Sequence, residues 1–132
     1  MGSKHRALEG TPVVPPGPAA VDLHTHTDRS DGLLPPDALI AQAAIAGVRI
    51  LAITDHDTLA GFRALGPRPP GITVLPGVEI NSVADEIADL WEGELHILGL
   101  GVDPDDAAFE AALARQRDGR VERFRRMAER LH

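Results

Sequence analysis

Short, almost continuously apolar runs recur along this chain, and polar or turn-forming residues separate them. Runs of this kind are typical of buried strands, and residues 48–54 have the pattern of a strand that is covered on both faces. They predict strands over residues 19–24, 48–54, 72–80 and 95–100. Residues 84–90 are compatible with either a helix or a loop.

Helical spacing fills the segments between the predicted strands. Pro35 and Pro36 suit the first turn of a helix that continues to about Ala46, and Gly47 is placed to end it. A short helix is expected over residues 59–65. The alternation of strands and helices predicts an α/β fold with mostly parallel strands.

A long last helix is predicted to follow the acidic turn at residues 103–106, because Asp favours helix N-termini. Gly119 is a candidate break in it, since glycine in a helix costs about 1 kcal/mol relative to alanine. The expected buried stripe consists of Leu113, Val121, Phe124, Ala128 and Leu131.

Composition narrows the class of protein. The 132 residues amount to one domain, and we expect a disordered Pro-rich tail over residues 1–18 and a folded domain over residues 19–132. The net charge of −7 disfavours a general nucleic-acid-binding surface.

No run approaches the roughly 20 apolar residues of a membrane span, and no signal peptide is evident, so a cytoplasmic protein without membrane contact is expected. Because cysteine is absent, metal ligands must be His, Asp, Glu or backbone.

Histidines and carboxylates gather at the ends of the predicted strands. His24 and His26 are two residues apart, and in a strand such side chains face the same side about 7 Å apart, so both can reach one ion. Asp22 can share that face or fix a histidine tautomer. Two polar residues at a strand end explain the pair equally well.

Two further motifs favour a metal site. Asp31 lies in a Ser-Asp-Gly sequence, which alone indicates only a turn. Residues 54–57, Thr-Asp-His-Asp, end an apolar strand, and in parallel α/β folds sites assemble at such ends. Helix capping by Asp57 is the alternative explanation of this motif.

Two single residues complete the pattern. Glu79 lies within an apolar run, and a carboxylate is seldom buried there unless it is paired or bound to a metal. His96, taken singly, is more often a satisfied core histidine than a ligand. In combination, the motifs predict a metal centre that activates water for hydrolysis.

The motifs DLHTHT, SDG, TDHDT, PGVE and LHILGLG occur in this order from about Val21 to the end of the chain. They resemble those of the PHP (polymerase and histidinol phosphatase) superfamily, above all its stand-alone nucleoside 3′,5′-bisphosphate phosphatases and 5′–3′ exoribonucleases. The resemblance implies the N-terminal part of a distorted (β/α)7 barrel, with up to three divalent ions (manganese, iron or zinc) at the strand ends. It also implies hydrolysis of phosphate esters of nucleotides or RNA 5′ ends by a metal-activated water.

The resemblance assigns roles to individual residues. It implies the metal ligands His24, His26, Asp31, His56, Glu79 and His96, with Glu79 bridging two ions. Asp55 and Asp57 match nearby positions, where they would orient other groups rather than bind an ion.

The chain departs from this branch after His96. Its longer members supply a further His and an Asp-x-His motif, whereas here only His132 follows. We therefore expect a truncated N-terminal portion of the domain, which self-associates or is complemented by a C-terminal half. Three hypotheses follow: a phosphoesterase acting on a small phosphate ester or a short oligonucleotide, a catalytically silent metal-binding fragment, and a histidinol phosphate phosphatase.

Arginines are concentrated on the predicted last helix. They are Arg115, Arg117, Arg120, Arg123, Arg125, Arg126 and Arg130. One interpretation is a face that binds phosphate groups. The other is a solvated helix face, in which Glu122 and Glu129 are interleaved with the arginines.

Overall fold

The computed structural model describes residues 20–83 and 94–129. Its elements are β1 (Val21–Thr25), α1 (Pro36–Ile45), β2 (Ile50–Ile53), α2 (Ala60–Arg63), β3 (Thr73–Val83), β4 (Glu94–Leu100) and α3 (Ala107–Glu129). The tail expected over residues 1–18 and the ambiguous residues 84–90 lie outside the described residues. No helix within the described ranges is long and apolar enough to cross a membrane. A cytoplasmic location stays a prediction.

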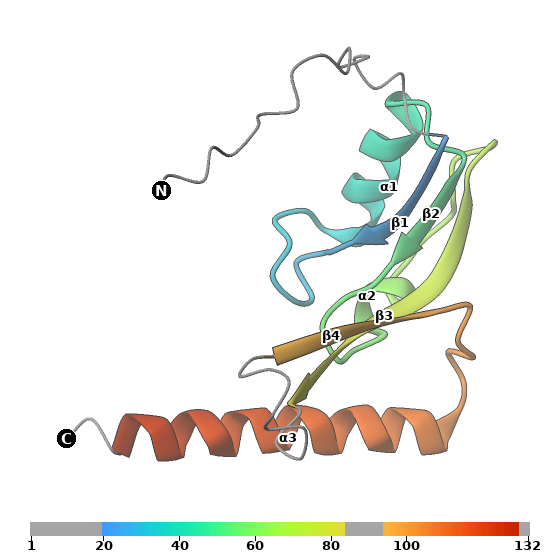
Figure 1. Cartoon of the computed structure of the whole chain (residues 1–132). Coiled ribbons are helices and arrows are strands. Elements are labelled where there is room, and N and C mark those ends of the chain that lie inside the picture. The colour runs from blue at the N-terminus through green and yellow to red at the C-terminus, as the bar shows by residue number, and fades with distance from the viewer. Residues whose placement is uncertain (1–19, 84–93, 130–132) are drawn as a thin grey trace, which may run out of the picture.

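The strands form one sheet in the order β1-β2-β3-β4 (Figure 1). β1 pairs with β2, and β2 with β3, in parallel, whereas β4 runs antiparallel to β3. The prediction of a mostly parallel α/β fold is confirmed, with β4 as the antiparallel exception. This order aligns the C-terminal ends of β1 and β2 with the middle of β3.

β3 changes its pairing partner along its length. Residues 73–76 pair with β2, and residues 77–83 pair with β4. At the change, a Cβ on Gly77 would stand 2.9 Å from the carbonyl oxygen of Ile53, so the close approach of the strands requires glycine there. The second half of β3 carries Glu79, which therefore lies beyond the end of β2.

The ends of the helices follow from local sequence. α1 begins at Pro36 and is followed by Gly47, whose φ is 87°. Among the amino acids, glycine adopts a positive φ of this kind most readily. α3 is capped by Asp106, whose carboxylate accepts hydrogen bonds from the backbone N–H groups of Ala108 and Phe109. The break considered at Gly119 is absent, because α3 is continuous through this residue.

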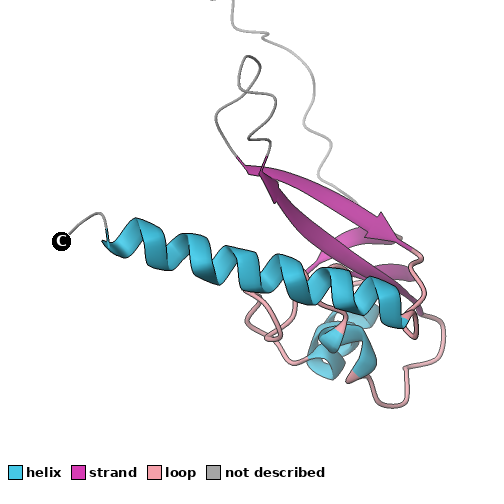
Figure 2. Cartoon of the chain, turned by 90° about the horizontal axis from the view of Figure 1, so that it is seen from below, coloured by secondary structure: helices cyan, strands magenta, loops and turns pink. Residues whose placement is uncertain are grey.

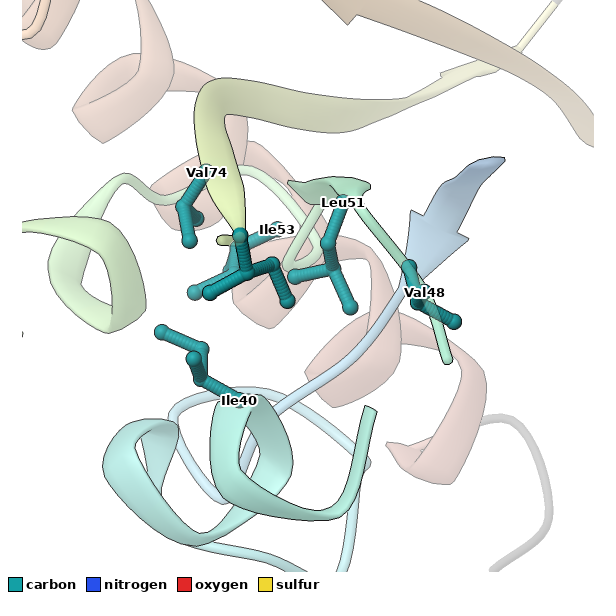
Figure 3. Close-up of a cluster of buried hydrophobic side chains, with 6 residues drawn as sticks. Ile40, Val48, Leu51, Ile53 and Val74 are labelled. Carbon is teal, nitrogen blue, oxygen red and sulfur yellow. The ribbon is translucent and has the colours of Figure 1, made fainter. Parts of the chain in front are cut away.

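Two apolar clusters form the core of the described residues. The larger packs α1 against β2 and β3 and consists of Ile40, Val48, Leu51, Ile53, Ile72 and Val74 (Figure 3). The smaller joins α3 to the sheet through Leu59, Val78 and Leu113. The core thus fixes β2 and β3, the strands that lead to the polar residues described below.

β1 and β4 are more exposed than the predicted buried strands. Val21 of β1 is 48% exposed, and Ile97 of β4 is 47% exposed. Both strands are outermost in the sheet of the described residues, so each has a neighbour on one side only. The prediction that these two runs form buried strands is therefore wrong for the described residues.

The predicted buried stripe of α3 is confirmed only at its start. Leu113 is buried, but Val121 is half exposed and Phe124 is 72% exposed. The physical reason is that the C-terminal half of α3 projects beyond the sheet (Figure 2). Leu131 lies outside the described residues.

Candidate metal centre

The sheet brings the predicted ligands to one place from five segments of the chain. His24 is on β1, His26 and Asp31 follow β1, His56 follows β2, Glu79 is on β3 and His96 is on β4. His56 forms an isolated parallel bridge with Glu79, so the pairing of β2 with β3 resumes at the site. The ends of β1 and β2, the middle of β3 and the antiparallel β4 therefore bring these six residues side by side.

Glu79 lies at the middle of this group. Its side chain is only 5% exposed, and its Oε2 lies 2.9 Å from Nε2 of His24 and 2.9 Å from Nε2 of His26. Its other oxygen, Oε1, lies 2.6 Å from Nδ1 of His96. One buried carboxylate thus contacts three imidazoles that come from two different strands and a loop.

His56 and Asp31 close the other side of the group. Nε2 of His56 lies 3.4 Å from Oδ2 of Asp31 and 3.7 Å from Oε2 of Glu79. Nδ1 of His26 lies 3.1 Å from Oδ1 of Asp31, so the two ring nitrogens of His26 face two different carboxylates.

These residues form three overlapping groups, each with its donor atoms within 4.8 Å of one another. The groups are His24–His26–Glu79, His26–Asp31–His56 and His56–Glu79–His96. Metal–ligand bonds of about 2.0–2.2 Å place neighbouring donors about 3 Å apart, close to the nitrogen–oxygen distances found here. The arrangement and the chemistry of the donor set therefore fit divalent ions such as manganese, iron or zinc.

The protonation state of Glu79 agrees with this fit. Burial by itself raises the pKa of the carboxyl group, but hydrogen bonds from His24 and His96 and the charge of His56 outweigh burial. The pKa of Glu79 consequently lies below its ordinary value. The residue is held as a carboxylate, the form that binds a cation.

Asp55 organises the loop that carries His26 and Asp31. Its buried carboxylate accepts hydrogen bonds from the backbone N–H of Thr27, the Thr27 hydroxyl and the Ser30 hydroxyl, each at 2.7 Å. A Cβ on Gly61 would stand 2.0 Å from Oδ2 of Asp55, so the packing around this carboxylate leaves no room for a side chain.

Asp57 links the loop after β2 to β3 and α3. Its backbone N–H donates to the carbonyl of Glu79 at 2.9 Å, and its Oδ1 accepts from the backbone N–H of Asn81 at 3.1 Å. Arg120 of α3 pairs with its Oδ2 at 3.0 Å. Neither Asp57 nor Asp55 belongs to the three donor groups, and their predicted orienting role stays a prediction.

Some contributors could not be recognised from the sequence. Thr27 ends the DLHTHT motif and Ser30 begins the SDG motif, but nothing in their spacing indicates that both hydroxyls donate to Asp55. Arg117 and Arg120 belong to the arginine group, and neither interpretation of that group included a contact with Asp57. Asp22 makes a local contact: its carboxylate accepts a hydrogen bond from the backbone N–H of His24, at 3.4 Å.

Comparison with known proteins agrees with the motifs. A model of the PHP domain family matches residues 22–125. The chain is 43% identical over 115 residues to the 5′–3′ exoribonuclease Rnm of Salmonella typhimurium. It is 40% identical over 111 residues to the 3′,5′-nucleoside bisphosphate phosphatase of Chromobacterium violaceum. Each alignment covers 83% of this chain and 37% of the relative.

A solved structure of a related protein has a similar fold over the matched residues. The chain superposes with a TM-score of 0.68 on a candidate metal-dependent phosphoesterase from Bifidobacterium adolescentis, to which it is 35% identical. That match covers 84% of this chain and 37% of the other. The chain spans little more than a third of the relatives it matches. Its family is nevertheless shown by sequence and by structure: the chain belongs to the PHP domain family.

Proposed function

We propose that this chain is the metal-binding part of a phosphoesterase that hydrolyses phosphate esters of nucleotides or of RNA 5′ ends. The observation that carries the proposal is the buried Glu79 carboxylate in contact with three imidazoles. Such a carboxylate is costly to bury without cations or donors around it, and a metal site explains both the carboxylate and the imidazoles. The names of the relatives supply the substrate class.

The three donor groups indicate how the residues would hold the ions. His24, His26 and Glu79 would hold one ion, and His56, Glu79 and His96 a second, so that Glu79 bridges the two. Divalent ions at such sites activate a water for attack on phosphorus and neutralise charge on the phosphoryl oxygens. The imidazoles act as ligands in their neutral form. The exposed side chains of Asp31 and His24 leave the group open to an incoming substrate.

We propose manganese as the first ion to test, with iron and zinc as the alternatives. The ligand set consists of imidazoles and carboxylates, which are compatible with all three ions. A catalytically silent fragment is the second candidate function. It is favoured by the exposed apolar residues of β1 and β4, which could pack against a complementing segment or a second copy.

Turnover of defined substrates tests the proposal. The 132-residue chain is loaded with Mn²⁺, and release of phosphate or mononucleotide is measured from a nucleoside 3′,5′-bisphosphate and from a 5′-phosphorylated oligonucleotide. Multiple turnover that disappears with chelator, and in Glu79→Gln, supports the phosphoesterase. The matched control is His5→Ala, outside the predicted ligand set. A fully loaded chain without turnover would favour the silent fragment, and preferential hydrolysis of histidinol phosphate would favour the third hypothesis.

A further inference from the structure

Asp57 adopts a backbone conformation that most residues avoid. Its φ is 52°, and among the described residues it is the only non-glycine residue with a positive φ. Its side chain is fully buried as well. A residue held in this conformation inside a protein needs surrounding contacts that fix it.

Two arginines of α3 supply such contacts. Nη1 of Arg120 lies 3.0 Å from Oδ2 of Asp57, and Nη1 of Arg117 donates a hydrogen bond to the Asp57 carbonyl at 2.6 Å. α3 therefore contacts both the side chain and the main chain of Asp57. Arg117 also donates a hydrogen bond to Oε1 of Glu110, whose other oxygen, Oε2, accepts from Arg63. The bond to Glu110 fixes the orientation of the Arg117 guanidinium.

These contacts differ from those of the other arginine pairs on α3. The side chains of Arg117 and Arg120 are both 36% exposed, whereas Arg125 is 70% exposed and lies 3.9 Å from Glu122. An exposed pair at that distance contributes little. The Arg120 guanidinium instead lies at ion-pair distance from a fully buried carboxylate oxygen that accepts no hydrogen bond within the described residues. Arg117 and Arg120 thus form a defined contact within the arginine group.

Asp57 lies between two proposed ligands, His56 and Glu79. His56 immediately precedes Asp57, and the Asp57 N–H donates to the carbonyl of Glu79. Nδ1 of His56 is buried and has no hydrogen-bond partner among the described residues. Ligand imidazoles are ordinarily oriented by a hydrogen bond at the second nitrogen. Here the ring of His56 lies 4.7 Å and 5.3 Å, between ring centres, from the rings of His26 and His96, and the backbone at Asp57 sets where its Cα lies.

We propose that Arg120 and Arg117 are positioning residues of the metal centre. By holding Asp57 in its left-handed conformation, they set the place of the His56 ring and of the Glu79 backbone. The inference rests on the proposed function only in that His56 and Glu79 are taken as ligands. It assigns to α3 a role in metal affinity, rather than direct contact with a phosphate group.

Metal affinity tests this role in the full 132-residue chain. Mn²⁺ is titrated into apo protein by calorimetry for wild type, Arg120→Ala and Arg125→Ala. Loss of a group that orients a ligand weakens affinity about 10- to 100-fold, and we expect this for Arg120→Ala. Arg125→Ala is the matched control on the same helix and should retain wild-type affinity. Arg120→Lys keeps the charge and should recover part of the loss.

Two further measurements separate positioning from simple stabilisation. Thermal melts without metal show how much of each variant is folded, and affinity is computed for the folded fraction. Hydrogen exchange of the Asp57 amide should be faster in apo Arg120→Ala than in apo Arg125→Ala, because its bond to Glu79 is loosened. Should Arg120→Ala not fold, Arg120→Gln and Arg120→Lys provide the same comparison.

The outcomes distinguish this inference from the proposed function. If the wild type binds Mn²⁺ and Arg120→Ala binds it equally well, the positioning role is overturned and the metal centre stands. If the wild type binds no metal, the proposed function fails, and the role in metal affinity fails with it. If amide exchange at Asp57 is unchanged in Arg120→Ala, Arg120 does not hold the Asp57 backbone, and the proposal is overturned with or without metal.

Discussion

Asp55 holds Thr27 by two hydrogen bonds, one to the backbone N–H and one to the hydroxyl, each 2.7 Å long. Because Thr27 directly follows His26, this contact joins the end of β2 to the loop that carries two proposed ligands. Asp55 itself belongs to none of the three donor groups.

Replacing Asp55 tests how much this contact contributes. In Asp55→Asn one acceptor oxygen becomes a donor, so at least one buried group of Thr27 or Ser30 loses its partner. Buried unsatisfied groups cost about 1–3 kcal/mol each, and we expect the free energy of unfolding to fall by about 2–4 kcal/mol. Asp118→Asn, at an exposed position of α3, should change it by less than about 0.5 kcal/mol. Denaturant unfolding measures both, and equal effects would refute the structural role.

Alanine substitution at two helical glycines is predicted to change the stability of the protein in opposite directions. A Cβ on Gly61 would stand 2.0 Å from Asp55, whereas a Cβ on Gly119 meets nothing within 4 Å. Gly61→Ala should therefore destabilise the protein by about 1–3 kcal/mol through overpacking. Gly119→Ala should stabilise it by up to about 1 kcal/mol through helix propensity. Thermal unfolding of the two variants in parallel decides the point, and a shift of the same sign in both would contradict the packing described here.

The residues of the site could be predicted from the sequence better than their supports. His24, His26, His56 and Glu79 were predicted to converge because each lies at or near a strand end in an α/β pattern. The change of partner within β3 was not foreseen, since an apolar run does not reveal which strand it pairs with. It matters, because it turns the Glu79 segment towards β4 and His96.

The contacts of α3 could not be predicted for a different reason. Arginine spacing on a helix shows which side chains share a face, but it does not show which loop that face meets. The apolar spacing of Val121 and Phe124 likewise predicted burial, although both side chains are at least half exposed. Tertiary placement of one helix decides both questions.

The pH dependence of stability tests the link between α2 and α3. Burial raises the pKa of Glu110, but hydrogen bonds and charge from Arg63 and Arg117 outweigh it, so the pKa lies below its ordinary value of 4.5. The stabilisation is therefore present above pH 4.5 and is lost as the pH falls through the lower folded pKa. Glu110→Gln should lower stability by about 1 kcal/mol at neutral pH and by less in acid.

Glu122→Gln is the matched control for this experiment. Glu122 is exposed and lies 3.9 Å and 4.0 Å from its two arginine partners, so its replacement should have no measurable effect. Urea unfolding at pH 7 and at pH 3 provides the comparison. A Glu110→Gln effect that does not shrink in acid would show that the ion pair is not its cause.

Metal should stabilise the folded chain by mass action. An ion that binds the native state alone adds about 2.7 kcal/mol at a free concentration 100 times its Kd. We expect the melting temperature to rise on addition of Mn²⁺ and to return on addition of chelator. The rise should be lost in Glu79→Gln, since the carboxylate shared by two donor groups is replaced. Identical melting curves with and without metal would show that the site does not load.

Metal content tests the central claim most directly. The reconstituted and desalted 132-residue chain is compared by elemental analysis with His24→Ala/His26→Ala and with His5→Ala. The account predicts at least one bound transition-metal ion per chain in the wild type and in His5→Ala, and strongly reduced occupancy in the double variant. Metal at background level in the wild type, or equal occupancy in the double variant, would contradict the metal centre.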